Sequence, residues 1–169
     1  SAERAFEFLD EQVEVEEKSD ALPVKRVNGD FRISDLCFSY TQDGPVLQHV
    51  SMDIPAGSRV GIAGKTGAGK STFLSLLMRF YDPASGFIAL DGVNLKDYRV
   101  SDLRHQFGIV LQEPVLFSTS IADNIAYGRP SSSKAEIVAA ARAANAHDFI
   151  QEFEETFAAR GVAVRHTAW

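Results

Sequence analysis

The sequence has little cysteine and no long apolar run. Cys37 is the one cysteine among 169 residues, which excludes a disulfide within the chain and fits a reducing compartment. Because no apolar run approaches the roughly 20 residues of a membrane-crossing helix, we expect no transmembrane segment in this chain. Residues 1–17 are acidic and helix-prone, so we expect no secretory signal there.

An excess of positive charge is also missing. The chain has 17 Lys and Arg against 23 Asp and Glu, a net charge of −6, which does not favour nucleic acid as a partner. No internal repeat is visible. The length suits one domain, and 45% hydrophobic with 24% charged residues is ordinary for a globular chain.

A glycine-rich loop at residues 64–71 (GKTGAGKS) organises the rest of the chain. It matches the pattern G-x-x-x-x-G-K-[ST] at every fixed position. Glycines let successive backbone N–H groups point into one concavity that holds phosphate oxygens. Lys70 would reach the β- and γ-phosphates, and the Ser71 hydroxyl would ligate Mg²⁺. The candidate nucleotide-binding residues are Gly64, Lys65, Thr66, Gly67, Ala68, Gly69, Lys70, Ser71 and Thr72.

The flanks of this loop support a phosphate site. Residues 59–63 form a short apolar run that predicts a buried strand, and residues 72–80 predict the helix that follows. The N-terminus of that helix would add a favourable dipole for anions. A glycine-rich turn without a ligand is the alternative, and the agreement of strand, loop and helix disfavours it.

Other stretches predict strands. Residues 31–40 alternate in hydrophobicity, with an irregularity near Asp35, and residues 50–54 alternate again. Residues 87–90 form a strand that ends in an Asp-Gly turn, and residues 107–111 predict another buried strand.

Helix signals lie on both sides of these strands. Residues 1–10 have helical spacing, and residues 14–20 predict a solvated linker. Ser101 is predicted to cap a short helix, and residues 118–127 predict another. A capping box beginning at Ser133 predicts a helix that extends toward Ile150.

Four stretches together resemble the nucleotide-binding domain of an ABC transporter, of the exporter type whose membrane and ATPase domains share a chain. Residues 36–40 (LCFSY) end in an aromatic, as the A-loop of the family does, and residues 47–57 resemble the strand leading to the P-loop. Residues 107–114 are similar to the Q-loop, with Gln112 in the Q position. Residues 118–128 (STSIADNIAYG) resemble the segment that opens the helical subdomain.

This resemblance implies an α/β fold: a partial P-loop core of the RecA-like type, with an antiparallel β subdomain and the start of an α-helical subdomain. Residues 1–20 would be a helical extension from a membrane domain, and residues 21–169 a truncated ATP-binding domain. Tyr40 would stack on adenine, and Gln112 would contact Mg²⁺ or the attacking water. From the alternation alone, Tyr40 would be read as an ordinary strand aromatic, a reading that the family resemblance reverses. Gln112 could equally be a turn residue before Pro114.

The resemblance also implies cofactors and partners. These are ATP and Mg²⁺, a membrane domain and a second nucleotide-binding domain, and a place on the cytoplasmic side of a membrane for the complete transporter. Three family motifs are not found in residues 1–169: the signature loop, the Walker B Asp-Glu and the switch histidine. Residues 87–91 fail as Walker B because Gly92 follows the aspartate. We therefore expect this chain alone not to hydrolyse ATP.

Three functions stay open from the sequence. The first is the ATP-binding part of an ABC exporter. The second is a non-catalytic remnant that binds nucleotide weakly or only a partner subunit. The third is another P-loop enzyme, such as a small kinase, although Arg142, Arg160 and Arg165 are not clustered as the arginines of a kinase lid would be.

Overall fold

The computed structural model describes residues 15–41, 44–111 and 115–152. The chain divides into two compact units, Ser1–Ile109 and Val110–Trp169. The predicted helix at residues 1–10 and Gln112 lie outside the described residues. Among the residues that are described, no helix is long and apolar enough to cross a membrane.

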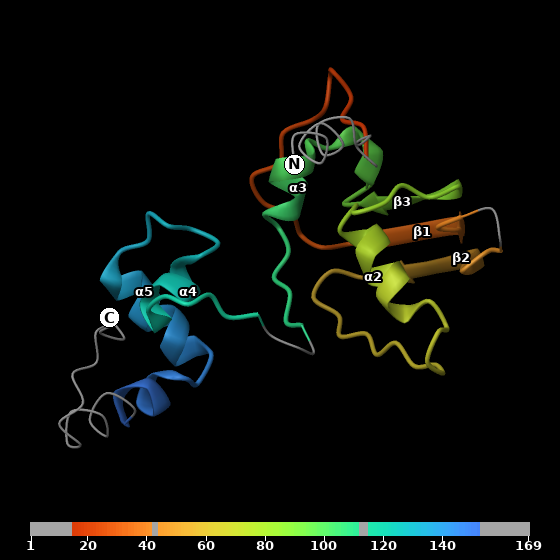
Figure 1. The fold of residues 1–169 in the computed structure, drawn as a ribbon. Helices are drawn as coiled ribbons and strands as arrows, with labels where there is room; N and C mark the ends of the chain where they lie inside the picture. The colour runs from red at the N-terminus through yellow and green to blue at the C-terminus, as the bar shows by residue number, and fades with distance from the viewer. Residues whose placement is uncertain (1–14, 42–43, 112–114, 153–169) are drawn as a thin grey trace, which may run out of the picture. The chain divides into compact units, whose positions relative to one another are not determined.

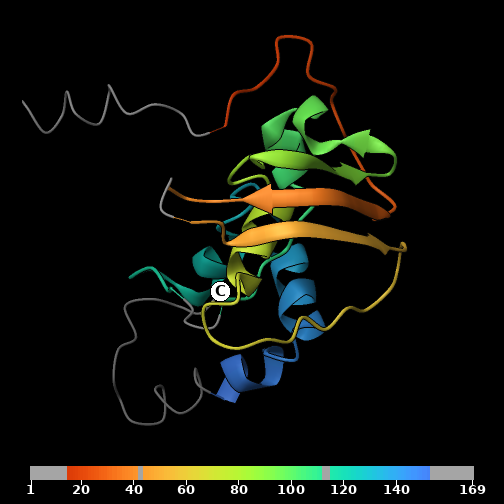
Figure 2. The ribbon, with the colours of Figure 1, turned by 90° about the vertical axis from the view of Figure 1, so that its right-hand side faces the viewer.

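The first unit is built on a four-stranded antiparallel sheet with the strand order β2-β1-β3-β4 (Figure 1). The strands are β1 (Phe31–Phe38), β2 (Leu47–Ile54), β3 (Ser85–Leu90) and β4 (Val93–Asn94). Helix α2 (Lys70–Leu77) lies behind the sheet when the molecule is turned by 90° (Figure 2). The predicted antiparallel β subdomain is therefore confirmed, and β3 is antiparallel, as expected of a strand that is not Walker B.

The predicted irregularity in β1 is a bulge at Asp35. Asp35 has a φ of 49°, and the pairing register with β2 shifts between Ile33 and Leu36. The extra residue turns Leu36 and Phe38 to the same side as Ile33, and all three are buried. This bulge lets β1 present one continuous apolar face to α2.

The core of this unit lies between the sheet and α2. Phe73 and Leu76 of α2 pack with the buried β1 side chains, with Leu47 of β2 and with Leu90 of β3. Because Phe73 closely follows the glycine-rich loop, this core fixes the C-terminal end of the loop, while residues 55–68 are exposed.

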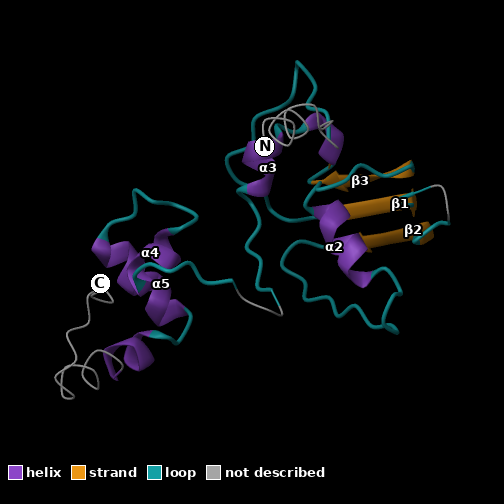
Figure 3. Ribbon diagram, in the orientation of Figure 1, coloured by secondary structure: helices purple, strands orange, loops and turns teal. Residues whose placement is uncertain are grey.

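Two predicted buried strands are absent from the structure. Residues 59–63 and 107–111 are in irregular conformation, and Val60, Ile62 and Ile109 are 42–53% exposed. Figure 3 shows the whole connection between β2 and α2 as a loop. A strand of a parallel sheet needs hydrogen-bonding neighbours, and none of the described segments pairs with either stretch. An apolar run in a sequence predicts burial but cannot supply that partner.

Arg79 holds three segments of the first unit together. Arg79 follows the last residue of α2 and is buried, with 1% of its surface exposed. Nη1 donates to the carbonyls of Leu95 and Tyr98 at 3.2 and 3.0 Å, and Nη2 donates to the carbonyl of Glu16 at 2.9 Å. Nε bonds the Asp82 carboxylate at 3.3 Å. The end of α2 is thereby tied to two segments that are distant in sequence.

The segment that begins at Val15 is bound to the rest of the first unit by side-chain contacts. Residues 16–20 are exposed, as a solvated linker would be, yet Val15 is buried and the Lys18 ammonium pairs with Asp97. A short 3₁₀ helix, η1 (Leu95–Asp97), is followed by α3 (Val100–Arg104). The Glu17 carboxylate accepts from the N–H of Val100 at 2.7 Å. The predicted cap of α3 by Ser101 is therefore wrong: the N-cap is Arg99, and Glu17, distant in sequence, accepts the hydrogen bond from the first N–H of the helix.

The second unit contains α4 (Ile121–Ala126) and α5 (Lys134–Ala143). Ser120 caps α4, and the predicted capping box between Ser133 and Glu136 is confirmed at the start of α5. The predicted continuation of α5 to Ile150 is wrong, because Asn145 has a φ of 56° and interrupts the helix before residues 147–152 become helical again. Ala141 and Ile150 are buried and pack with Ile121 and Ile125.

Candidate functional site

The glycine-rich loop has two residues in the left-handed backbone conformation. Gly67 and Gly69 have φ values of 83° and 82°, which side-chain-bearing residues rarely adopt. A Cβ on Gly69 would also lie 2.8 Å from Leu47 Cδ2 and 3.2 Å from the Val46 carbonyl oxygen. Glycine is thus required at residue 69 both by conformation and by the close approach of the segment that leads into β2.

The Lys70 side chain turns back onto the first residues of the glycine-rich loop. Its ammonium donates to the carbonyls of Gly64 and Lys65, at 2.8 Å in each case. These neutral acceptors hold the ammonium against the loop, and neither contact compensates its charge with a carboxylate. The Lys70 ammonium is therefore already held at the loop before any phosphate binds.

The start of α2 is open to an anion. Gly69 is its N-cap, no side chain caps it, and its first turn has no acidic residue. The first N–H groups of a helix have no partner within the helix and carry the positive end of the dipole. The N-terminus of α2 and the Lys70 ammonium, here called the cradle, are both features that attract anions.

The rest of the loop is accessible. Ser71 is exposed in the first turn of α2, where its hydroxyl can reach a bound cation. Lys65, Thr66, Gly67 and Ala68 are exposed as well. Among the described residues, no group of three His, Cys, Asp or Glu side chains could hold a metal. A divalent cation here would depend on Ser71, water and phosphate oxygens, which is how Mg²⁺ is commonly held.

Tyr40 lies beside the start of α2. Its hydroxyl donates to Thr72 Oγ1 at 3.1 Å, and its ring makes edge-on contacts with Phe38 and Tyr81, with centroids 4.9 and 5.1 Å away. The residue is nevertheless 53% exposed. The structure thus brings Tyr40 and the loop together and leaves much of the tyrosine available to a ligand.

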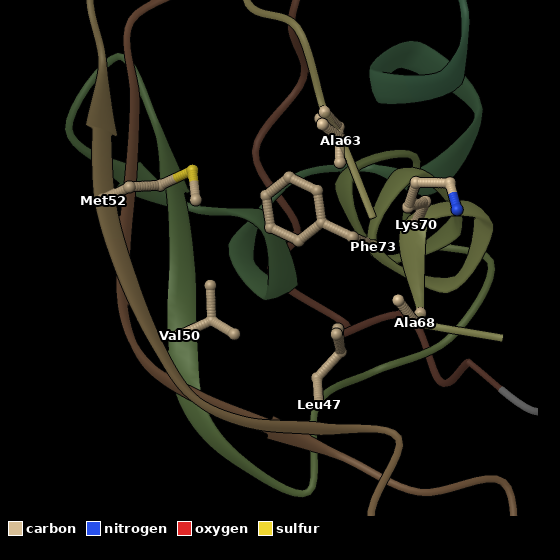
Figure 4. A pocket seen from close by; sticks show the side chains of 9 residues that line it. Leu47, Val50, Met52, Ala63, Ala68, Lys70 and Phe73 are labelled. Carbon is tan, nitrogen blue, oxygen red and sulfur yellow. The ribbon is translucent and has the colours of Figure 1, made fainter. Parts of the chain in front are cut away.

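An apolar pocket of about 140 Å³ lies between β2 and the loop (Figure 4). Phe73 reaches from α2 toward Val50 and Met52 of β2, while Ala63, Ala68 and Lys70 line the side of the loop. Its lining is mostly apolar, so the pocket does not suit phosphate. The pocket and the charged cradle adjoin each other, and Lys70 belongs to both.

A second group of polar side chains lies at the bulges of β1 and β2. His49 Nδ1 bonds the Asp35 carboxylate at 2.7 Å, and this bond raises the pKa of the imidazole. A hydrogen bond from the Ser85 side chain, followed by one from the His49 backbone N–H, lowers the pKa of Cys37. These side chains belong to the sheet and are not part of the loop, so no role in phosphate binding follows.

Sequence reasoning missed two residues near the site. Tyr81 contacts Tyr40, and Arg79 fixes the chain on which Tyr81 stands. An aromatic directly before Asp82-Pro83 was the available signal for Tyr81. Arg79 gave no signal, because an arginine in the last turn of a predicted helix is ordinarily solvated.

Comparison with known proteins decides the family. The family model described as ABC transporter matches residues 47–166. The chain belongs to the ABC transporter family. Membership sets aside the small-kinase alternative, and it confirms the partial P-loop fold with its antiparallel sheet. ABC ATPases bind nucleotide, so the family agrees with the phosphate geometry of the loop.

Relatives of known sequence and structure agree with this membership. The chain is 44% identical to the uncharacterized ABC transporter ATP-binding protein YknV of Bacillus subtilis (strain 168), over 94% of this chain and 26% of that protein. It is 39% identical to the ATP-dependent lipid A-core flippase of Syntrophus aciditrophicus (strain SB), over 92% of this chain and 26% of that protein.

A solved structure of a bacterial Atm1-family ABC exporter with ATP bound has a TM-score of 0.82 and 40% identity to this chain. The match covers 89% of this chain and 26% of that one. This ABC transporter chain thus spans about a quarter of the length of the relatives and the structure that it matches.

Proposed function

We propose that this chain binds ATP as the nucleotide-binding portion of an ABC exporter. The observation that carries the proposal is the link between Tyr40 and Thr72. Thr72 stands in the first turn of α2, whose N-terminus forms the phosphate cradle. Tyr40, whose exposed ring suits a base, is therefore hydrogen-bonded to α2, whose N-terminus suits the phosphates.

Each residue has a part in this proposal. Lys70 exchanges its two loop carbonyls for phosphate oxygens, which are stronger acceptors because they are charged. The N–H groups of residues 67–72 surround the phosphates, and Ser71 ligates Mg²⁺ when the metal accompanies the nucleotide. Tyr40 offers its ring to adenine, a contact that every base can make. Gln112, outside the described residues, would complete the Mg²⁺ contacts.

The complete protein extends this proposal. In it, residues 1–20 join the ATP-binding domain to a membrane domain, and a second nucleotide-binding domain faces the site. The ATP-binding domain then lies on the cytoplasmic side of the membrane and couples ATP hydrolysis to export. Residues 1–169 contain no signature loop, Walker B motif or switch histidine. Binding, rather than turnover, is therefore what we propose for this chain by itself.

Calorimetric titration with ATP and Mg²⁺ tests the phosphate cradle. Lys70→Ala should weaken ATP binding roughly ten- to a hundredfold, because charge-assisted hydrogen bonds contribute about 1.5–3 kcal/mol each. Lys25→Ala, at an exposed position away from the loop, is the matched control and should bind as the wild type does. Equal affinity of the Lys70 variant and the wild type would show that the loop is not the site.

The base contact is tested with two ligands. Tyr40→Ala should weaken ATP more than inorganic triphosphate, because only ATP has a base to stack. Tyr40→Trp should roughly preserve ATP affinity. Equal weakening of both ligands by Tyr40→Ala would mean that Tyr40 acts through the fold and not through adenine.

A further inference from the structure

Three side chains surround the exposed ring of Tyr40. The rings of Phe38 and Tyr81 stand nearly perpendicular to it, at interplanar angles of 86° and 89°, and Thr72 receives its hydroxyl proton. Phe38 and Tyr81 also contact each other, with centroids 5.5 Å apart. The three rings therefore form one cluster, which is here called the aromatic cluster.

Phe38 and Tyr81 reach this cluster from different parts of the fold. Phe38 is buried at the end of β1, two residues before Tyr40. Tyr81 comes from the connection between α2 and β3, which is far from Tyr40 in sequence. Tyr81 is thus the one ring of the cluster that ties Tyr40 to the region beyond the P-loop helix.

The position of Tyr81 is fixed on both sides. Before it, the Arg79 guanidinium is buried and bonds the Asp82 carboxylate across Tyr81. After it, the N–H of Ala84 donates to the carbonyl of Cys37 at 3.0 Å, which ties the connection to the end of β1. Tyr81 therefore stands on a rigid base, and it can restrain a neighbour that is itself half exposed.

Tyr40 needs such restraint if it is to hold a base. A flat ring stacks well only in one orientation, and ordering a free side chain at the moment of binding costs affinity. With much of its surface in solvent, Tyr40 depends on few contacts for its orientation. Edge-on aromatic contacts have a preferred geometry, so they restrain a ring as well as attract it.

We propose that Tyr81 is a positioning residue for the base site: it holds Tyr40 in the orientation that stacks on adenine, without touching the nucleotide. This inference rests on the proposed adenine contact of Tyr40 and adds to it a residue that determines how well the contact forms. The phosphate cradle does not depend on Tyr81, so the loss of Tyr81 affects ligands with a base and spares inorganic triphosphate.

The test compares ATP with inorganic triphosphate by calorimetric titration of the purified chain. Tyr81→Leu should weaken ATP about two- to tenfold and leave triphosphate affinity unchanged, since one aromatic contact and the ordering of one ring are lost. Tyr81→Phe keeps the ring and should restore ATP affinity. Tyr127→Leu is the matched control: it removes a tyrosine that stacks on Phe117 in the other unit, and it should change neither ligand.

A double-mutant cycle separates this inference from the proposed function. In a Tyr40→Ala background, Tyr81→Leu should have no further effect on ATP, because the ring that it positions is gone. A further loss there, or equal weakening of ATP and triphosphate by Tyr81→Leu, would overturn the positioning role.

The remaining outcomes are also decisive. If Tyr40→Ala weakens ATP selectively and Tyr81→Leu has no effect, the positioning role is wrong and the adenine contact stands. If Tyr40→Ala leaves ATP affinity unchanged, the adenine contact is wrong and the positioning role is wrong with it. Should Tyr81→Leu fail to fold, Tyr81→Met fills the same volume with a flexible chain and carries the same comparison.

Discussion

Replacing Arg79 by methionine tests the central contact network of the first unit. Methionine keeps much of the apolar stem and removes every donor of the guanidinium. The carbonyl of Tyr98 then loses a buried hydrogen bond of 3.0 Å, and those of Leu95 and Glu16 lose bonds of 3.2 and 2.9 Å. The Leu95 carbonyl keeps the N–H of Tyr98 at 3.3 Å, and Glu16 is exposed enough for water to replace its donor.

The expected loss of stability follows from these contacts. One buried carbonyl left unsatisfied costs about 1–3 kcal/mol, and each of the other two weakened carbonyls costs about 1 kcal/mol. Removing the need to bury a charge offsets part of this sum. We expect Arg79→Met to lower the free energy of unfolding by about 2–4 kcal/mol. Arg79→Lys keeps the charge without the planar fork and should lose about half as much.

Urea unfolding followed by circular dichroism measures this loss. At an m-value of about 1–3 kcal/mol per molar urea, the midpoint should fall by roughly 1 M or more. Arg32→Met is the matched control, because Arg32 makes an ion pair with Asp53 in which both side chains are about 70% exposed. That variant should stay within about 0.5 kcal/mol of the wild type. If Arg79→Met were as stable as Arg32→Met, the hydrogen bonds of Arg79 to Leu95, Tyr98 and Glu16 would not contribute to the stability of the first unit.

Two further changes test the loop and the sheet. Gly69→Ala should destabilise the chain by about 1–3 kcal/mol through its left-handed conformation, and by more than Gly92→Ala, which has the same φ of 82° but no atom within 4 Å of its added Cβ. Equal losses in thermal unfolding would mean that the approach of Leu47 to the loop is unimportant. Burial by itself would raise the pKa of Asp91, but N–H groups of Asp30, Asn28 and Gly29 bond its carboxylate and together hold the pKa below its usual value. This stabilisation is complete above the pKa of the unfolded chain, near pH 4, and is lost as the pH falls through the lower folded pKa. Asp91→Asn should therefore be less stable than the wild type at pH 7, and its stability should fall less steeply below pH 4. Parallel stability curves for the two proteins would refute this account.

The sequence predicted those parts of the fold that depend on local chemistry. The bulge at Asp35 was visible because one extra residue shifts the alternation of apolar side chains. The capping box at Ser133 was visible because both partners lie within one turn. The loop at residues 64–71 was visible because its glycines and lysine have fixed spacing.

Parts of the candidate site could not be predicted in this way. Thr72 and Tyr40 were both expected to bind nucleotide, but the hydrogen bond that joins them crosses 32 positions of sequence. Tyr81 and Arg79 owe their importance to partners on β1, η1 and the segment near Glu16. Neither residue belongs to a motif.

By itself, then, the sequence determined the phosphate-binding loop, the antiparallel strands and the resemblance to ABC transporters. The loop follows from the spacing of neighbouring residues and the strands from periodicity, while the antiparallel pairing was what the resemblance implied. The tertiary structure alone decided that residues 59–63 and 107–111 are not strands, that Arg79 is buried and that Tyr81 contacts Tyr40. A strand needs a partner to accept its hydrogen bonds, and a buried guanidinium needs carbonyls to receive its donors. Those partners come from segments that are distant in sequence and meet only when the chain folds, so a local sequence pattern does not identify them.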